Sequence, residues 1–305
     1  MYIRFLKSEL YRASKLKCTY ILLIVLLALS MIMNFVLLKF DFLGQLGIDS
    51  QMFMELGEGG NSMEGVNDAA QIGSYMSNQI VVEGEKERTI IGEGLFYKSD
   101  VPQLFYVHVS DLDTIMLLAI FVGIFVGDIM STGINKNLII SNNKLSTLYL
   151  ARVTVIALYA LIMQIFTWLF AVLGAALWAE SVIFNFGKTF FVYFFVTYFL
   201  SLVFSLLVYA ITLVTRSKAA GITIGVVLST GALTLIISIA NWAIITKFGL
   251  ESDFSVANYM LTENMGSFAL DYTNGELVRA LVVGVVYAVI AVGAVLITNK
   301  KRDLA

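Results

Sequence analysis

The sequence predicts an all-α polytopic membrane protein with six transmembrane helices, an N-terminal interfacial helix and a small extracellular α/β insertion. Of its 305 residues, 59% are hydrophobic and 14% are charged, with one proline; soluble domains have about 45–50% apolar and about 25% charged residues. Charges are missing from long stretches, and basic residues gather on one side of the predicted membrane. This composition excludes an ordinary soluble enzyme, a disordered chain and a disulfide scaffold.

Charge-free stretches mark the predicted spans, because a helix needs about 20 apolar residues to cross about 30 Å of hydrocarbon. Five stretches are long enough: 18–38, 153–179, 189–215, 219–246 and 280–299. The remaining stretch, 114–127, has 14 residues between Asp113 and Asp128, or about 21 Å at 1.5 Å per residue. We predict it as the second span, with an earlier start if Asp111 and Asp113 lie at headgroup depth or face protein.

Lysine and arginine residues predict the orientation. With six spans both termini share one side, which has 13 of the 20 basic residues and three acidic ones, a net charge of +10. The other side has seven basic and 19 acidic residues, a net charge of −12. Because cytoplasmic loops are rich in Lys and Arg, both termini are expected in the cytoplasm.

Residues 1–17 are predicted to form a cytoplasmic amphipathic helix on the membrane surface. The apolar residues at helical spacing are Ile3, Leu6, Leu10, Ala13 and Leu16. The basic residues of the other side are Arg4, Lys7, Arg12 and Lys15. A plain basic flank that only sets the orientation is the alternative.

The segments between spans complete the predicted organisation. Residues 39–113 form an acidic extracellular subdomain, with short β-runs at 80–82 and 89–91; a mobile loop is the alternative. The last extracellular loop carries aromatic and methionine residues that favour a position in the interface over one in water. The other segments are an inner loop at 128–152, an outer loop at 180–188, an inner turn at 216–218, the outer loop at 247–279 and a cytoplasmic tail at 300–305.

The sequence contains no convincing catalytic or metal site. One cysteine, Cys18, excludes an intrachain disulfide and a CxxC motif, and one histidine, His108, excludes HExxH. Lys188 and its neighbours resemble the end of a P-loop, but Val182 stands where the first glycine is required. We expect no bound cofactor and no nucleic-acid partner, a reduced buried thiol at Cys18, and His108 at a surface or interface outside the membrane.

Small and polar residues within the spans favour close helix packing. Two GxxxG motifs, Gly123 with Gly127 and Gly221 with Gly225, allow helices to approach within the chain or between chains. The polar residues Asn34, Gln164 and Asn241 either line a substrate path or form hydrogen bonds between helices. The aromatic residues of the fourth span, from Phe190 to Phe199, either pack and contact lipid or line a path for an apolar substrate.

Asp128 ends the second span, where the helix dipole disfavours a negative charge. An acid at this end is expected to have a cationic partner. The candidates are Lys136, Lys144, Arg152, Arg216 and Lys218.

This arrangement resembles the permease subunits of type-2 ABC transporters (the ABC-2 family). The segment FLKSELYRASKLK is similar to the family opening K-x-E-L-x-K-x-x-x-x-K. The residues Asp128, Gly133, Asn137, Leu138 and Ser141 follow the family pattern E-x-x-x-G-T-x-x-x-L-x-x-P-x-x-R. The sequence departs from it with Asp for the usual Glu, Asn142 near the usual proline and Lys144 near the usual arginine.

The resemblance implies an ATP-driven exporter of a peptide, bacteriocin, drug or other amphipathic compound in a bacterial cytoplasmic membrane. Two permeases, identical or paralogous, would pair, and each would dock on a cytoplasmic ABC ATPase that binds ATP and Mg²⁺. This chain has no Walker motif, so it would not be an enzyme itself. The residues implied in ATPase coupling are Glu9, Asp128, Gly133, Lys136, Asn137, Leu138, Ser141 and Lys144.

Two other functions remain open from the sequence. A non-transporting sensor or scaffold would display the acidic outer subdomain. An ion-coupled secondary transporter is disfavoured because the predicted spans contain no charged residue, whereas such carriers place acids or bases within the membrane.

Overall fold

The computed structural model describes residues 2–39, 99–110, 112–131, 145–179, 182–184, 186–230, 232, 239 and 255–302. Within these ranges the chain is helical except for two short strands, β1 (Ser99–Asp100) and β2 (Val182–Ile183), which pair in parallel. Four helices are long and apolar enough to cross a membrane, and a bent pair of helices makes a fifth. The chain is therefore an all-α multi-pass membrane protein.

The helices follow one another with short connections. They are α1 (Tyr2–Lys15), α2 (Lys17–Lys39), α7 (Val101–Ser110), α8 (Asp113–Ser131), α10 (Leu145–Trp178), α11 (Lys188–Thr215), α12 (Lys218–Ser229), the 3₁₀ helix η1 (Val256–Tyr259), α14 (Leu261–Ser267) and α15 (Asn274–Arg302).

Four of the predicted spans correspond to α2, α10, α11 and α15. The helix α10 begins at Leu145 rather than after Arg152, so it has 34 residues and is about 51 Å long at 1.5 Å per residue. The expectation of charge-free spans is wrong here, because Arg152 lies inside this helix with no exposed surface. Of the predicted fifth span, the structure describes α12 and two further positions, Ala232 and Ile239. The β-runs expected at 80–82 and 89–91 lie outside the described residues.

The second span is broken into α7 and α8, which are bent by 52°. Leu112 joins them in a left-handed conformation, with φ of 59°. The sequence analysis placed residues 101–110 in the outer loop, but Val101, Leu104 and Phe105 have no exposed surface. His108 is likewise 6% exposed rather than a surface residue. The segment VPQLFYVHVS is mostly apolar, so it folds into the bundle instead of extending into water.

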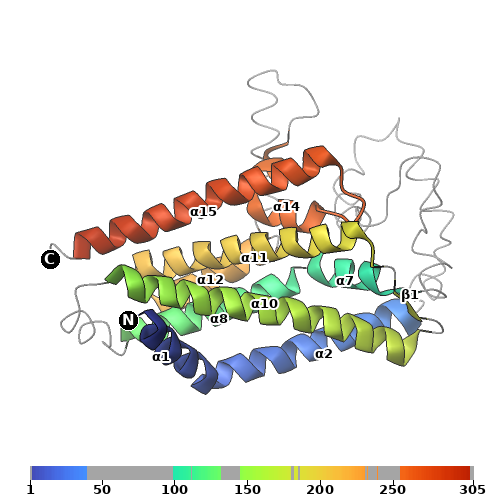
Figure 1. The fold of residues 1–305 in the computed structure, drawn as a ribbon, viewed down its shortest axis with the longest axis horizontal. Helices are drawn as coiled ribbons and strands as arrows, with labels where there is room; N and C mark the ends of the chain where they lie inside the picture. Colours follow the sequence, from blue (N-terminus) through green and yellow to red (C-terminus); the bar gives the residue numbers. More distant parts are fainter. Residues whose placement is uncertain are drawn as a thin grey trace.

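The helices form one elongated bundle (Figure 1), with α11 packed against α15 on one side and against α8, α10 and α12 on the other. The helix α2 packs on α10, and α12 packs on α8. α1 and the last turns of α15 lie at the same end, which we call the α1 end. The opposite end, with α7 and α14, is called the α7 end.

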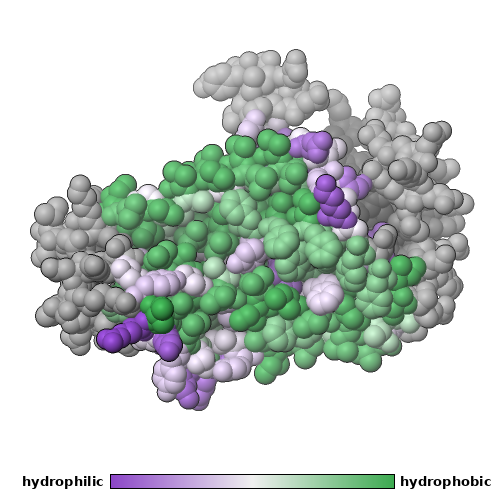
Figure 2. All heavy atoms as spheres, viewed as in Figure 1, coloured by the Kyte–Doolittle hydropathy of each residue, from purple (hydrophilic) through white to green (hydrophobic). Residues whose placement is uncertain are grey.

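The surface of the bundle is apolar. Figure 2 shows hydrophobic residues over most of the visible described face, with hydrophilic residues gathered over α1 and around the beginning of α15. The interior is also apolar at α8, where Phe121, Val122 and Phe125 have no exposed surface. A chain that is hydrophobic both inside and outside is suited to lipid rather than to water.

Aromatic rings close the α7 end. Phe105 of α7 lies 5.7 Å from Phe190 and 6.0 Å from Tyr193 of α11, between ring centroids. Phe268, which follows α14, stacks on Tyr193 at 5.8 Å. The last outer loop therefore packs on protein through Phe268 and the buried Met265, a closer attachment than the interfacial position expected from sequence.

The two GxxxG motifs meet each other between α8 and α12. A Cβ atom on Gly123 would lie 2.5 Å from Cγ1 of Ile222, and one on Gly127 would overlap Lys218. A Cβ atom on Gly225 would lie 2.8 Å from that of Ala119. Gly221 faces Thr212 of α11 with equally little space. The close contact joins helices of a single chain, and it requires glycine because no side chain fits between the backbones.

We predict that Gly225→Ala destabilises the protein by about 1–3 kcal/mol, because the added methyl overpacks the α8–α12 contact. Thermal unfolding in detergent micelles measures this effect. The matched control is Gly293→Ala in α15, where nothing lies within 4 Å of the added carbon. It should be neutral or stabilising by about 0.5–1 kcal/mol.

A compensating change tests the same contact. Ala119→Gly in the Gly225→Ala background moves the methyl group from one helix to the other, so it should recover much of the lost stability. A double variant no more stable than Gly225→Ala alone would contradict the proposed cause.

Candidate functional site

The most distinctive polar feature of the bundle is a buried ion cluster at the α1 end. The Glu9 carboxylate of α1 accepts a hydrogen bond from Nε of Arg152 at 3.1 Å, and its other oxygen lies 2.8 Å from Nη2 of Arg12. The Glu9 side chain is 6% exposed and that of Arg152 is fully buried. We call these three residues the Glu9 cluster.

Two further contacts fix α1 to the bundle. The Tyr2 hydroxyl lies 2.7 Å from the Thr154 hydroxyl of α10. The Arg12 guanidinium donates to the Phe125 carbonyl of α8 at 3.2 Å and lies 4.3 Å from the centre of the Phe125 ring. Together they hold α1 against the beginning of α10 and the end of α8.

The packed face of α1 differs from the expected apolar stripe. Glu9 and Ala13 are its buried residues, whereas Ile3 and Leu10 are 66% and 38% exposed. An interfacial helix was expected to hide its apolar residues and to expose its charges. The reverse holds at Glu9 because Arg152 of α10 offers it a buried partner, and an unpaired guanidinium in that place would be unfavourable.

Burial and charge oppose each other at Arg12. Burial lowers the pKa of Arg12 to about 10, and the Glu9 carboxylate partly offsets this decrease. Arg12 therefore remains protonated at neutral pH. The Tyr209 side chain of α11 lies beside Arg152 and is 1% exposed, so the cluster reaches from α1 through α10 to the centre of the bundle.

Asp128 forms a second ion pair at the same end. Its Oδ1 atom accepts a hydrogen bond from Nζ of Lys218 at 2.7 Å, and the two side chains are 34% and 46% exposed. This partner is one of the five cations expected from sequence. The pair joins the last turn of α8 to the first turn of α12, and its exposure makes it weaker than the Glu9 cluster.

The other residues expected in coupling are not described. Gly133, Lys136, Asn137, Leu138, Ser141 and Lys144 lie outside the described residues. Their flanks are known, since α8 ends at Ser131 and α10 begins at Leu145. The undescribed segment 132–144 therefore starts and finishes beside helices that contact α1.

The polar residues of the spans form hydrogen bonds between helices. Asn34 of α2 lies 3.2 Å from Nε2 of His108 in α7 and donates to the Phe170 carbonyl of α10 at 3.2 Å. Gln164 of α10 donates to the Thr197 hydroxyl of α11 at 2.9 Å. Of the two roles that the sequence allowed, these two side chains have the packing role in this conformation. Asn241 lies outside the described residues.

Sequence reasoning missed Arg152, Arg12 and Tyr209 as parts of one site. It counted Arg152 as a flank of the third span, and nothing in local pattern pairs it with an acid 143 positions earlier. One signal was available: Glu9 is a single acid among six basic residues of the first 17 and their flank, Arg4, Lys7, Arg12, Lys15, Lys17 and Arg152.

Chemically, the cluster is an electrostatic attachment. Its two guanidiniums have no exchangeable proton at neutral pH, and the described residues contain no group of three or more metal-ligating side chains. The sequence matches no protein-family model and no curated protein, and the structure matches no solved structure. The resemblance to ABC-2 permeases thus stays a prediction, to be weighed on the geometry.

We predict that Glu9→Gln destabilises the protein by about 3–5 kcal/mol, because it leaves two buried guanidiniums without their counter-ion. Thermal unfolding in detergent micelles gives the measurement. Lys7→Gln on the exposed face of the same helix is the control and should change stability by no more than about 0.5 kcal/mol. Equal effects of the two substitutions would show that the buried pairing does not hold α1 in place.

Proposed function

We propose that this chain is the membrane subunit of an ATP-driven ABC exporter, with six spans and both termini in the cytoplasm of a bacterial cell. One observation carries the proposal. The Glu9 cluster ties α1 to α10 through Arg152 and to α8 through Arg12. These are the two helices that flank segment 132–144, the segment that the family resemblance implies in ATPase docking.

Mechanical coupling is the physical reason for weighing this observation. A partner that pushes on residues 132–144 acts on the end of α8 and on the beginning of α10 together. Because α1 is ion-paired to one and hydrogen-bonded to the other, the three helices move as a single body. ATP binding in the partner would then change the relative free energies of two arrangements of the bundle.

Other features are compatible with this topology. α1 and the last turns of α15 lie at one end of the bundle, as an even number of crossings requires. In sequence this end has the excess of basic residues that marks a cytoplasmic side. ATP hydrolysis would reside in the partner, and a second permease copy or a paralogue would complete the exporter. The cargo class, an amphipathic peptide, drug or bacteriocin, rests on the resemblance.

Co-purification tests the proposal. The full-length chain, tagged at its C-terminus and isolated from its native membrane in mild detergent, should recover an ABC ATPase in roughly equal amount. ATP hydrolysis in the purified sample provides a second measurement. Recovery of the chain without any ATPase would overturn the proposal and would favour the sensor or scaffold function.

We predict that reversing the charges of segment 132–144, with Lys136→Glu and Lys144→Glu together, lowers the recovered ATPase several-fold. The physical reason is that a basic docking segment loses its attraction to an acidic groove. Lys7→Glu, a reversal on the exposed face of α1, is the control. Unchanged recovery in the double variant would remove these lysines from the contact.

We predict a different result for Asp128→Asn. The Asp128–Lys218 pair is partly exposed, so its loss should lower the free energy of unfolding by no more than about 1 kcal/mol. If the pair transmits motion from segment 132–144, ATPase activity that depends on substrate should still decrease. Wild-type activity would assign the pair a structural role alone.

A further inference from the structure

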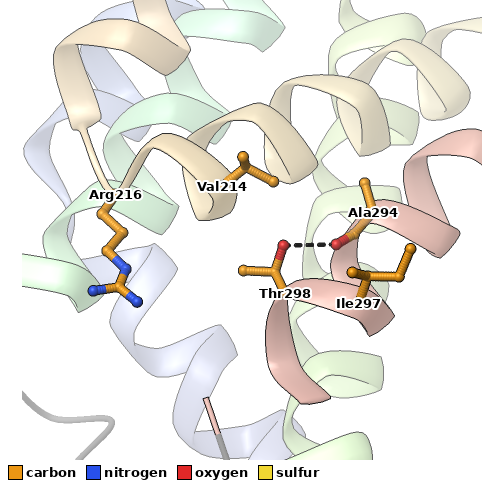
Figure 3. A pocket seen from close by; sticks show the side chains of 5 residues that line it. All are labelled: Val214, Arg216, Ala294, Ile297 and Thr298. Carbon is orange, nitrogen blue, oxygen red and sulfur yellow. Dashed lines mark hydrogen bonds between the residues drawn. The ribbon is translucent and has the colours of Figure 1, made fainter. Parts of the chain in front are cut away.

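A pocket opens between α11 and α15 at the α1 end, apart from the Glu9 cluster. Its volume is about 410 Å³, and it is lined by Val214, Arg216, Ala294, Ile297 and Thr298. Figure 3 shows Val214 and Arg216 on the side of α11 and the other three residues on α15. Three of the five lining side chains are aliphatic, so the walls are mostly apolar.

The hydrogen-bond donors available in the pocket belong to Arg216. The Thr298 hydroxyl donates to the Ala294 carbonyl at 2.7 Å, so its proton is used within α15 (Figure 3). Among the residues that the structure describes, the Arg216 side chain has no ion-pair partner, whereas its neighbour Lys218 pairs with Asp128. A guanidinium at the edge of an apolar pocket is suited to a ligand that is anionic at one end and apolar at the other.

The backbone at Arg216 supports a role for its side chain. The residue caps the C-terminus of α11 in a left-handed conformation, with φ of 53°. Glycine is the usual residue in this place because a Cβ atom is disfavoured there. Glycine would relax the backbone but would supply no guanidinium.

We propose that this pocket binds the phosphate headgroup of an anionic phospholipid, with an acyl chain lying along α11 and α15. Arginine forms paired hydrogen bonds with phosphate oxygens. The walls continue onto lipid-facing surface, since Val214 and Ile297 are 54% and 61% exposed on membrane-spanning helices. Basic pockets between spanning helices attract anionic headgroups.

The surrounding charge favours the same ligand. α15 extends past Thr298 to Lys300, Lys301 and Arg302, so its last turn is basic in sequence. A free anion would find one guanidinium and apolar walls, whereas a phospholipid uses both parts of the pocket. The apolar walls therefore favour a lipid over soluble phosphate.

Native mass spectrometry of the full-length chain in detergent tests the proposal. With dioleoylphosphatidylglycerol added, the wild type should retain one lipid more tightly than it retains dioleoylphosphatidylcholine. Arg216→Gly should weaken phosphatidylglycerol binding about fivefold, the effect of one basic residue at a membrane surface. Arg4→Gln, which removes an exposed arginine of α1, is the matched control and should bind as the wild type does.

A second variant tests the apolar part of the pocket without changing its charge. Ala294→Phe fills the space beside Arg216, so it should also weaken phosphatidylglycerol binding. Val289→Phe places the same ring on the same helix at a 66% exposed position away from the pocket, and it should have no effect.

Three results would overturn the proposal. The first is equal retention of the two lipids by the wild type, and the second is unchanged binding in Arg216→Gly. The third is displacement of phosphatidylglycerol by millimolar inorganic phosphate together with normal binding in Ala294→Phe, which would identify a site for a soluble anion. Thermal unfolding of each variant separates loss of binding from loss of folding.

Discussion

The pairing of Glu9 with Arg152 is the interaction on which the arrangement of the α1 end depends. A guanidinium with no exposed surface inside an apolar bundle is unfavourable unless a counter-ion reaches it. That counter-ion comes from α1, so α1 must lie across α10 for α10 to pack as it does. Arg12 then completes the pairing and brings the end of α8 into contact with α1. Membrane surface and protein thus compete for α1, and the buried charge decides for the protein.

The two ends of the bundle are held together by different forces. The α1 end relies on ion pairs between helices, and the α7 end relies on stacked rings of Phe105, Tyr193 and Phe268. Between them, glycine contacts bring α8 and α12 together without side chains. Directional charges fix an angle and a register, whereas aromatic packing tolerates small sliding. Movement of the bundle is therefore expected to pivot at the charged end.

Sequence reasoning succeeded where a local pattern decides the structure. The lengths of charge-free stretches predicted α2, α10, α11 and α15, and the unfavourable dipole at Asp128 predicted a cation that proved to be Lys218. It was wrong where tertiary contacts override the pattern. His108 was expected outside because the bend at Leu112 is invisible in hydropathy. Glu9 was placed on a solvated face because periodicity assigns polar residues to water, whatever faces them across the fold.

The break between α7 and α8 has a consequence for how the chain is made. The described part of α7 has ten residues and α8 has 19, and the bend at Leu112 interrupts the helical hydrogen-bond ladder between them. A short helix carrying a buried histidine is poorly stabilised in bare lipid, where an unpaired backbone group has no water to bind. Its cover comes from α10, α11 and α14, all synthesised later. Residues 101–128 must therefore wait, or shift, until the ribosome has delivered the following helices, which makes membrane insertion of this protein a cooperative event instead of a helix-by-helix one.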